Sequence, residues 1–277
     1  MNIKIFMCCH NGFSVIPPLC VPIQCGAALN PRIKRTIPDN TGDNISDKNR
    51  QYCELTAHYY AWKNVDADYY GFCHYRRFFC FGNSKKPYLV RGKLSENDKL
   101  LGTAEQIENL AKNFDIIIPK SEDMGLSVRE HYSSAKYHYA ADLELFIKLL
   151  KEKYPDISEA ADQYLKQNKQ FFCNMFIMKK DLFFKYCEML FDVLGEFDTL
   201  KTPYESFQSN RADGYLGEIF TGIFVSFKRS TDAMVKEIQR LDIGLSPAKT
   251  IGYFLFPPES KIRFNMKRFI KSIRKDF

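Results

Sequence analysis

Short apolar runs of strand length, each ending at polar residues, are the feature that most constrains how this chain folds. Four such runs occupy residues 3–9, 69–73, 114–119 and 171–178. Continuous apolar runs are typical of strands that are buried on both faces of a parallel sheet. The core is therefore expected to surround a sheet that is covered on both sides.

Stretches with helical spacing lie between these runs. Apolar side chains recur every three or four residues at about 48–63, 142–153, 181–195 and 213–227. Alternating strands and amphipathic helices indicate an α/β sandwich of three layers with a mainly parallel central sheet. We expect one domain over residues 1–258 and a separate tail at 259–277.

The composition favours a folded protein without a membrane span. The chain has 277 residues, of which 45% are hydrophobic, which is ample for a large core. Its apolar runs are far shorter than the roughly 20 residues of a spanning helix. The N-terminus does not fit a secretory signal, so the protein is expected in the cytoplasm.

The nine cysteines are predicted to be reduced core residues. Their number is odd and no CxxC pair occurs, which argues against a disulfide framework and a structural zinc site.

The net charge of +7 is concentrated at the C-terminus. Residues 261–277 hold seven cations and one anion, which leaves +1 for the rest of the chain. No nucleic acid is therefore expected as a partner. Apolar residues in the tail follow helical spacing, so we predict a basic amphipathic helix that binds an anionic membrane surface. Docking of the tail onto the domain is the alternative.

Polar residues at the strand ends form the first group of site candidates. Ligands of open α/β sheets bind at the carboxyl ends of strands, which selects His10 and the segment from His74 to Arg77. A guanidinium group fits phosphate oxygens, and an imidazole can bind phosphate or a divalent ion. If the strand continues, Arg76 and Arg77 face opposite sides, so both reach one ligand only if the chain turns. The alternative is that the arginines are solvated or paired with carboxylates.

The turn before the first predicted helix is a second candidate. Its acceptors and amides, Asp43 and Asn44 among them, suit a ribose or base edge, and the helix N-terminus suits an anion. The sequence has neither a GxxxxGK[ST] loop nor a GxGxxG fingerprint. An ordinary turn with a helix cap would have a similar sequence.

Three further groups have weaker signals. His138 and Asp142 lie four residues apart near a helix start, and Asn174 interrupts an apolar run, where its amide needs partners. Another helix start has Arg211, Asp213 and Glu218 around it. A carboxylate there either binds a sugar hydroxyl or only interacts with the helix dipole.

A family resemblance connects these groups. The matching stretches are TGDNISDKNRQYCELTAHYYAWKN, DYYGFCHYRRFF, HYAADL, NMFIMKKDLF and RADGYLGEIF, within about residues 3–230. In them the chain resembles a bacterial family of capsular and exopolysaccharide glycosyltransferases, formerly a domain of unknown function. The resemblance implies a GT-A-like fold and transfer of a hexose, galactose as pyranose or furanose, from a UDP-sugar. The acceptor would be a lipid-linked capsular, exopolysaccharide or O-antigen glycan at the inner face of the cell membrane.

The resemblance also implies roles for residues. Most GT-A enzymes hold Mn²⁺ or Mg²⁺ with an Asp-x-Asp; here His74 to Arg77 take that place, so the need for a metal is open and His74 is the candidate ligand. Glu218 is favoured over Asp213, where the family usually has an apolar residue. If the configuration inverts, Glu218 or Asp142 would be the base; if it is retained, no dedicated base is required. The implied donor-binding residues are His10, Thr41, Asp43, Asn44, Asn49, Glu54, His74, Arg76 and Arg77; the acceptor or sugar-binding residues are Asn174, Met175, Arg211 and Asp213; the catalytic residues are Glu218, Asp142 and His138.

Two other functions fit parts of the sequence. One is a metal-dependent hydrolase or phosphotransferase that uses its histidines. The other is a noncatalytic scaffold at the membrane, suggested by the tail and the missing Asp-x-Asp.

Overall fold

The structure is a computed structural model that describes residues 1–82, 88–91, 94–95, 98–204, 206 and 208–244. The tail and the proposed boundary at residue 258 lie outside these residues. No helix in the described ranges is both long and apolar enough to cross a membrane.

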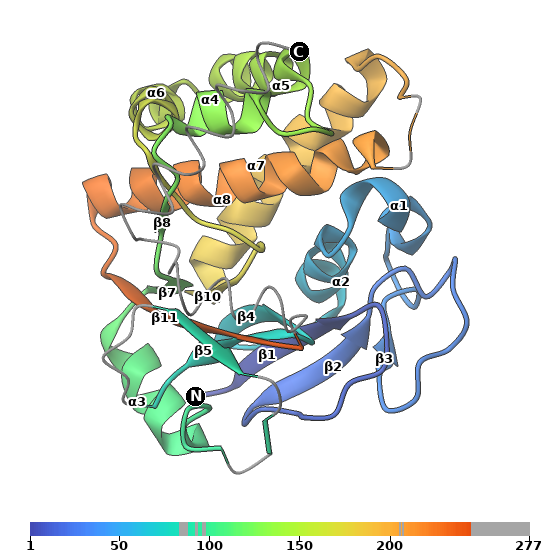
Figure 1. The fold of residues 1–277 in the computed structure, drawn as a ribbon, viewed down its shortest axis with the longest axis vertical. Helices are drawn as coiled ribbons and strands as arrows, with labels where there is room; N and C mark the ends of the chain where they lie inside the picture. Colours follow the sequence, from blue (N-terminus) through green and yellow to red (C-terminus); the bar gives the residue numbers. More distant parts are fainter. Residues whose placement is uncertain (83–87, 92–93, 96–97, 205, 207, 245–277) are drawn as a thin grey trace.

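A nine-stranded mixed sheet forms the centre of the molecule (Figure 1). Strands β1, β2, β3 and β4 are parallel, with β1 between β2 and β4. On the other side of β4 the pairings of β10 and β5 are antiparallel. The strands are β1 (Ile3–Cys9), β2 (Cys20–Gln24), β3 (Ile37–Pro38), β4 (Tyr69–His74), β5 (Arg77–Cys80), β6 (Tyr88–Arg91), β7 (Ile116–Pro119), β10 (Phe176–Lys179) and β11 (Val235–Ile243); β8 (Glu122–Asp123) and β9 (Lys169–Gln170) form a separate pair.

The expectation of a mainly parallel sheet is wrong beyond β4. There β4, β10, β7, β11 and β5 each pair with the next, and β5 pairs with β4, so these five strands close into a ring. Strand β5 is antiparallel to β4 because only two residues separate them. A run buried on both faces contains no signal for its direction, so the sequence pattern of β10 did not reveal its orientation.

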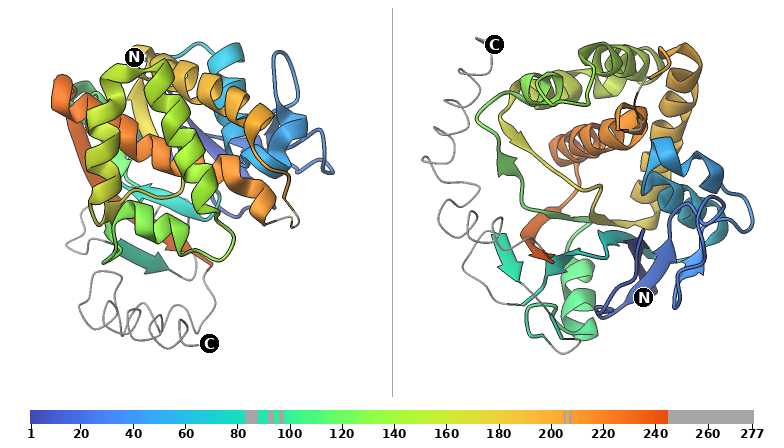
Figure 2. Two further views of the ribbon diagram at one scale, coloured as in Figure 1. Left: turned by 90° about the horizontal axis from the view of Figure 1, so that it is seen from above. Right: turned by 45° about the vertical axis from the view of Figure 1, so that its right-hand side comes forward.

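Helices cover both faces of the sheet (Figures 1 and 2). Helices α4 to α8 lie over one face and α3 over the other. The helices are α1 (Asn49–Tyr52), α2 (Leu55–Asn64), α3 (Ala104–Asn113), α4 (Val128–Ser133), α5 (Ala140–Lys153), α6 (Ser158–Lys166), α7 (Lys180–Leu200) and α8 (Ala212–Thr231), with short 3₁₀ turns at Ser46–Lys48, Pro155–Ile157 and Ser209–Arg211.

Strand β4 shows why its apolar run is continuous. Tyr70 and Phe72 belong to the core beneath the large helical layer, whereas Tyr69 and Cys73 belong to the core on the side of α3. Successive side chains of a strand point to opposite faces, so both faces of β4 require apolar residues. The α/β class is confirmed.

Three of the four predicted helices are confirmed as α5, α7 and α8. The helix expected at 48–63 is broken at Cys53, where φ is 53°. The carbonyl oxygen of Cys53 accepts hydrogen bonds from Asn49 Nδ2 at 2.7 Å and Thr56 Oγ1 at 3.1 Å. These local side-chain bonds stabilise a turn there instead of a continuous helix.

The run at 171–178 is a strand only from Phe176 onward. Cys173 and Asn174 have φ values of 77° and 47°, which no strand accommodates. Asn174 therefore lies in a turn, not within the strand. All nine cysteines are free thiols, as predicted.

Candidate active site

A cavity of about 1420 Å³ opens at the carboxyl ends of β1, β2 and β4. This is the place where ligands of such sheets bind. Its lining consists of residues 10–13, 24–25, 29–35, 49–50, 53–54 and 74–77 together with Cys173, Arg211 and Glu218.

Positive charge dominates the lining of the cavity. Against its two carboxylates, Glu54 and Glu218, stand seven basic side chains: Arg32, Lys34, Arg35, Arg50, Arg76, Arg77 and Arg211. None of the seven forms an ion pair with a carboxylate of a described residue. Clustered cations without counter-ions repel each other, so the cavity is suited to an anionic ligand.

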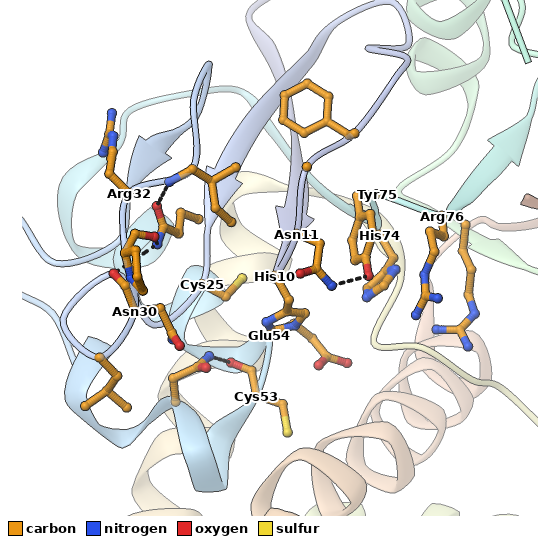
Figure 3. A pocket seen from close by; sticks show the side chains of 18 of the residues that line it. His10, Asn11, Cys25, Asn30, Arg32, Cys53, Glu54, His74, Tyr75 and Arg76 are labelled. Atoms are coloured by element: carbon orange, nitrogen blue, oxygen red, sulfur yellow. Dashed lines mark hydrogen bonds between the residues drawn. The ribbon is translucent and has the colours of Figure 1, made fainter. Parts of the chain in front are cut away.

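The chain turns immediately after β4. His74 pairs with Arg77 across the turn, and Arg76 and Arg77 both line the cavity. Because the chain turns here, Arg76 and Arg77 are able to reach the same ligand. Figure 3 shows Arg76 beside His74 and Tyr75, with Asn11 donating to the Tyr75 hydroxyl at 3.3 Å.

His74 is neutral in this setting. Burial and the positive charge of Arg77 lower the pKa of His74 to about 2. Its Nδ1 atom is buried and has no hydrogen-bond partner among the described residues. A neutral imidazole keeps one N–H donor. His74 can therefore offer a ligand a hydrogen bond next to the arginines without adding positive charge.

The residues at the end of β4 do not fit a divalent cation. Among the described residues, no group of three or more His, Cys, Asp or Glu side chains is arranged to hold a metal ion. The expected metal position instead contains Arg76 and Arg77, which repel a cation. His74 therefore lacks the partners that a metal ligand needs.

The two cavity carboxylates are held by neighbouring residues of one turn. Glu54 accepts a hydrogen bond from Asn174 Nδ2 at 3.0 Å, and Glu218 accepts one from the backbone N–H of Cys173 at 2.8 Å. Burial, and then the negative charge of Glu54, raises the pKa of Glu218 to about 7. Glu218 is thus able to gain or lose a proton near neutral pH.

The N-terminus of α8 brings Arg211 and Glu218 to the cavity. The Nε atom of Arg211 donates to Cys53 Sγ at 3.2 Å. Gly214 permits this approach, because a Cβ atom at that position would lie 2.9 Å from the same sulfur. The turn at Cys53 thus packs directly against α8 at Gly214, where a larger residue would not fit.

The loop predicted to bind the donor does not line the cavity. Thr41 and Asp43 are exposed, and Asn44 is half-buried. Asp43 accepts from the Tyr59 hydroxyl at 3.2 Å. The other predicted donor-binding residues do line it: His10, Asn49, Glu54, His74, Arg76 and Arg77.

His138 and Asp142 lie in the helical layer, outside the cavity lining. The His138 ring packs between Tyr132 and Tyr215, with ring centroids at 4.4 and 4.1 Å. Asp142 is buried in the first turn of α5, and burial raises its pKa. Neither residue is placed to act on a ligand in the cavity.

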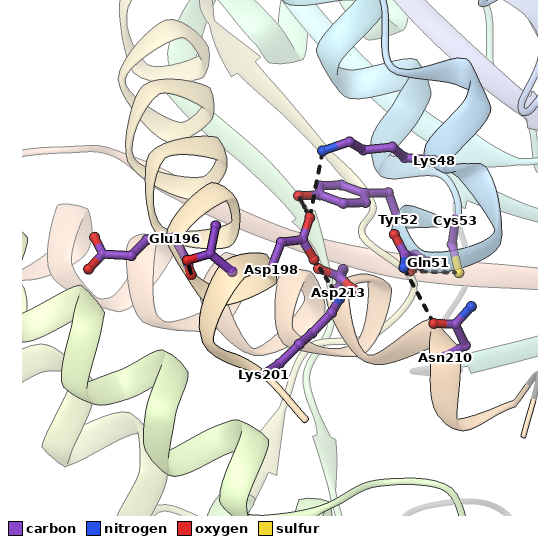
Figure 4. A network of polar contacts seen from close by, with 10 residues as sticks. Lys48, Gln51, Tyr52, Cys53, Glu196, Asp198, Lys201, Asn210 and Asp213 are labelled. Carbon is purple, nitrogen blue, oxygen red and sulfur yellow. Dashed lines mark hydrogen bonds and ion pairs between the residues drawn. The ribbon is translucent and has the colours of Figure 1, made fainter. Parts of the chain in front are cut away.

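Met175 and Asp213 are structural residues. Met175 is buried in the core on the α3 side of the sheet. Asp213 is fully buried and pairs with Lys201 at 2.8 Å. Figure 4 shows that Lys201 also binds Asp198, which accepts from the Tyr52 hydroxyl at 2.7 Å. This network joins α1, α7 and α8 and does not line the cavity.

The sequence prediction missed the segment 29–35, which brings Arg32, Lys34 and Arg35 to the cavity. Gln24, fully buried at the end of β2, holds this segment. Its side chain donates to the Pro31 carbonyl at 2.8 Å and accepts from the Ile33 N–H at 2.8 Å. A glutamine at the end of an apolar run could have indicated this segment. The run was not recognised as a strand because Pro22 lies inside β2, and proline is unusual within a strand.

Residues 4–229 match the model of a protein family described as a domain of unknown function, DUF4422. The chain belongs to this family. The DUF4422 domain contains every residue of the cavity lining. No curated protein matches the sequence.

The fold of this DUF4422 domain is similar to that of a solved glycosyltransferase. The apo structure of the WbbM bifunctional glycosyltransferase superposes with a TM-score of 0.84 and 29% sequence identity. The match covers 88% of this chain and 46% of that chain, so this chain spans about half the length of WbbM. The expectation of a glycosyltransferase fold is thereby confirmed.

Proposed function

We propose that this protein is a glycosyltransferase that transfers a hexose, galactose in its pyranose or furanose form, from a UDP-sugar to a capsular, exopolysaccharide or O-antigen glycan. The observation that carries this proposal is a cavity at the strand ends whose lining has two carboxylates and seven cations, none of which forms an ion pair within the described part of the chain. The similarity to WbbM supports the reaction type. The cavity exceeds the roughly 300–1,000 Å³ of typical ligand pockets, which leaves room for both donor and acceptor.

In this proposal the donor diphosphate binds Arg76, Arg77 and Arg211. An acceptor hydroxyl oxygen bonds to the anomeric carbon as the bond between that carbon and the diphosphate oxygen breaks. The electron pair leaves on the UDP oxygen, where the guanidinium groups stabilise the developing charge. His74 donates a hydrogen bond to the same oxygens.

Glu218 accepts the proton of the acceptor hydroxyl. Its pKa of about 7 matches that of a base working at neutral pH. Asp142 and His138 have no part in this step, because they lie outside the cavity. The uridine then lies along residues 10–13, 24–25 and 29–35, next to the diphosphate.

The cellular setting belongs to the same proposal. We place the enzyme in the cytoplasm at the inner face of the membrane, where its acceptor is lipid-linked. Residues 261–277 would bind the anionic surface through their net charge of +6.

Thermal unfolding with a panel of UDP-sugars tests this function. A ligand that binds only the folded protein raises its melting temperature. We expect a rise with UDP-galactose, of the same size with and without Mn²⁺ or Mg²⁺, and a much smaller rise for the Arg76→Ala/Arg77→Ala variant. No rise with any nucleotide sugar would contradict the proposal.

A further inference from the structure

Cys173 and Asn174 form a strained turn directly before β10. Both residues have positive φ values, 77° and 47°, a region that residues with a Cβ atom rarely occupy. Two such residues in succession persist only where surrounding contacts hold them. Those contacts lead to the two carboxylates of the cavity.

The amide of Asn174 has no N–H left for a ligand. Asn174 is 3% exposed, and its Nδ2 atom donates both to Glu54 Oε1 at 3.0 Å and to the Gly214 carbonyl at 3.1 Å. Its Oδ1 atom lies 3.5 Å from the Thr221 hydroxyl. The expected contact between Asn174 and a sugar is therefore not supported.

The same turn reaches the second carboxylate through its backbone. The N–H of Cys173 donates to Glu218 Oε1 at 2.8 Å. Glu54 precedes α2 and Glu218 lies on α8, so one dipeptide joins carboxylates from two separate segments of the chain. Glu54 Oε2 accepts no hydrogen bond from the residues that the structure describes, which leaves it for a ligand.

We propose that Asn174 is a positioning residue that acts on the transfer reaction through Glu54, and that the Cys173–Asn174 turn fixes the two carboxylates relative to each other. This inference rests on the proposed function. Glu54 receives the hydroxyl groups of the transferred sugar, while Glu218 takes the acceptor proton. An amide donor on Oε1 prevents Glu54 from rotating away.

Asn174→Gly removes the amide and keeps a residue that tolerates the left-handed turn. We expect the affinity for UDP, measured by calorimetry, to stay within about twofold, because Asn174 does not line the cavity. The value of kcat should fall at least tenfold with little change in KM for the donor. Asn168→Gly is the matched control, since Asn168 is exposed and bonds Asp123 at 2.9 Å, and its kcat should not change.

A double-mutant cycle separates action through Glu54 from a general structural effect. Asn174→Gly should cost nothing further in kcat once Glu54→Ala is present. Independent, multiplying losses would overturn the inference. If Asn174→Gly does not fold, Thr221→Val offers a second variant, with a smaller loss that again disappears in the Glu54→Ala background.

A readout without turnover keeps this inference distinct from the proposed function. The carboxyl ¹³C resonance of Glu54, assigned by its absence in Glu54→Gln, should shift in Asn174→Gly and stay in place in Asn168→Gly. An inactive wild type with that shift would contradict glycosyl transfer and leave Asn174 holding Glu54. An unmoved Glu54 resonance would overturn the positioning role, whatever the activity.

Discussion

At the scale of single residues, Glu218 combines burial with access to the cavity. The charges of Glu54 and Arg77 act on it, and among the described residues it accepts a hydrogen bond from the Cys173 backbone. Because this environment raises its pKa to about 7, Glu218 ionises as the pH rises through neutrality. The pH dependence of both its catalytic role and its effect on stability follows from this.

Replacing Glu218 with Gln removes the proton acceptor and keeps the size of the side chain. We expect kcat to fall about 10²- to 10⁴-fold, while the affinity for UDP changes little. In the wild type, kcat should rise with pH through about 7, where Glu218 ionises. Steady-state kinetics from pH 5 to 9 measures both; an unchanged kcat in the variant would exclude Glu218 as the base.

The stability of the same variant should depend on pH. Because the folded-state pKa of Glu218 is raised from 4.5 to about 7, its ionisation destabilises the fold as the pH rises through that range. Glu218→Gln should therefore unfold like the wild type near pH 4 and be more stable by about 3 kcal/mol at pH 8. Urea unfolding at both values tests this, and an equal difference at both would contradict it.

The arginines after β4 should decide donor affinity. Arg76→Ala and Arg77→Ala each remove charged hydrogen bonds to the diphosphate, which should weaken UDP binding by about 1.5–3 kcal/mol. Arg129→Ala, which breaks an exposed pair with Glu144, is the control and should bind UDP normally. Calorimetry that gives equal affinities for all three variants would place the diphosphate elsewhere.

At the scale of elements, the buried network of Lys201, Asp198 and Asp213 fixes α8 against α1 and α7. The Lys201 side chain is 8% exposed and lies 2.5 Å from Asp198 and 2.8 Å from Asp213. This arrangement holds the start of α8, and with it Arg211, beside the cavity.

Lys201→Met should destabilise the protein by about 3–5 kcal/mol, because the buried Asp213 loses its counter-ion and Asp198 keeps only Lys48, 3.7 Å away. Lys185→Met removes an exposed pair with Glu188 and should cost under about 1 kcal/mol. Chemical unfolding at pH 7 compares the two. Similar stabilities would mean that the network does not hold the helices together.

At the scale of the whole molecule, the sequence predicted what depends on local pattern. The ends of β1 and β4 were found because apolar runs stop there at His10 and His74. Helices α5, α7 and α8 were found from their spacing.

What the sequence did not reveal depends on contacts between distant residues. The turn at Cys173 requires Glu218, and the position of Arg211 requires Cys53 and Gly214. The direction of β10 is set by its pairing with β4 and β7. Thr41 and Asp43 looked suitable because polar turn residues resemble ligand-binding residues, yet neither lines the cavity, and Asp43 instead bonds Tyr59 and Asn64 of α2.

A crystal structure of the protein with bound UDP tests the central claim most directly. The account predicts the diphosphate within hydrogen-bond distance of Arg76 and Arg77, at the end of β4 and beside His74, with Glu218 facing the space beyond the terminal phosphate. A diphosphate bound away from both arginines, or a cavity that stays empty at millimolar UDP, would contradict it.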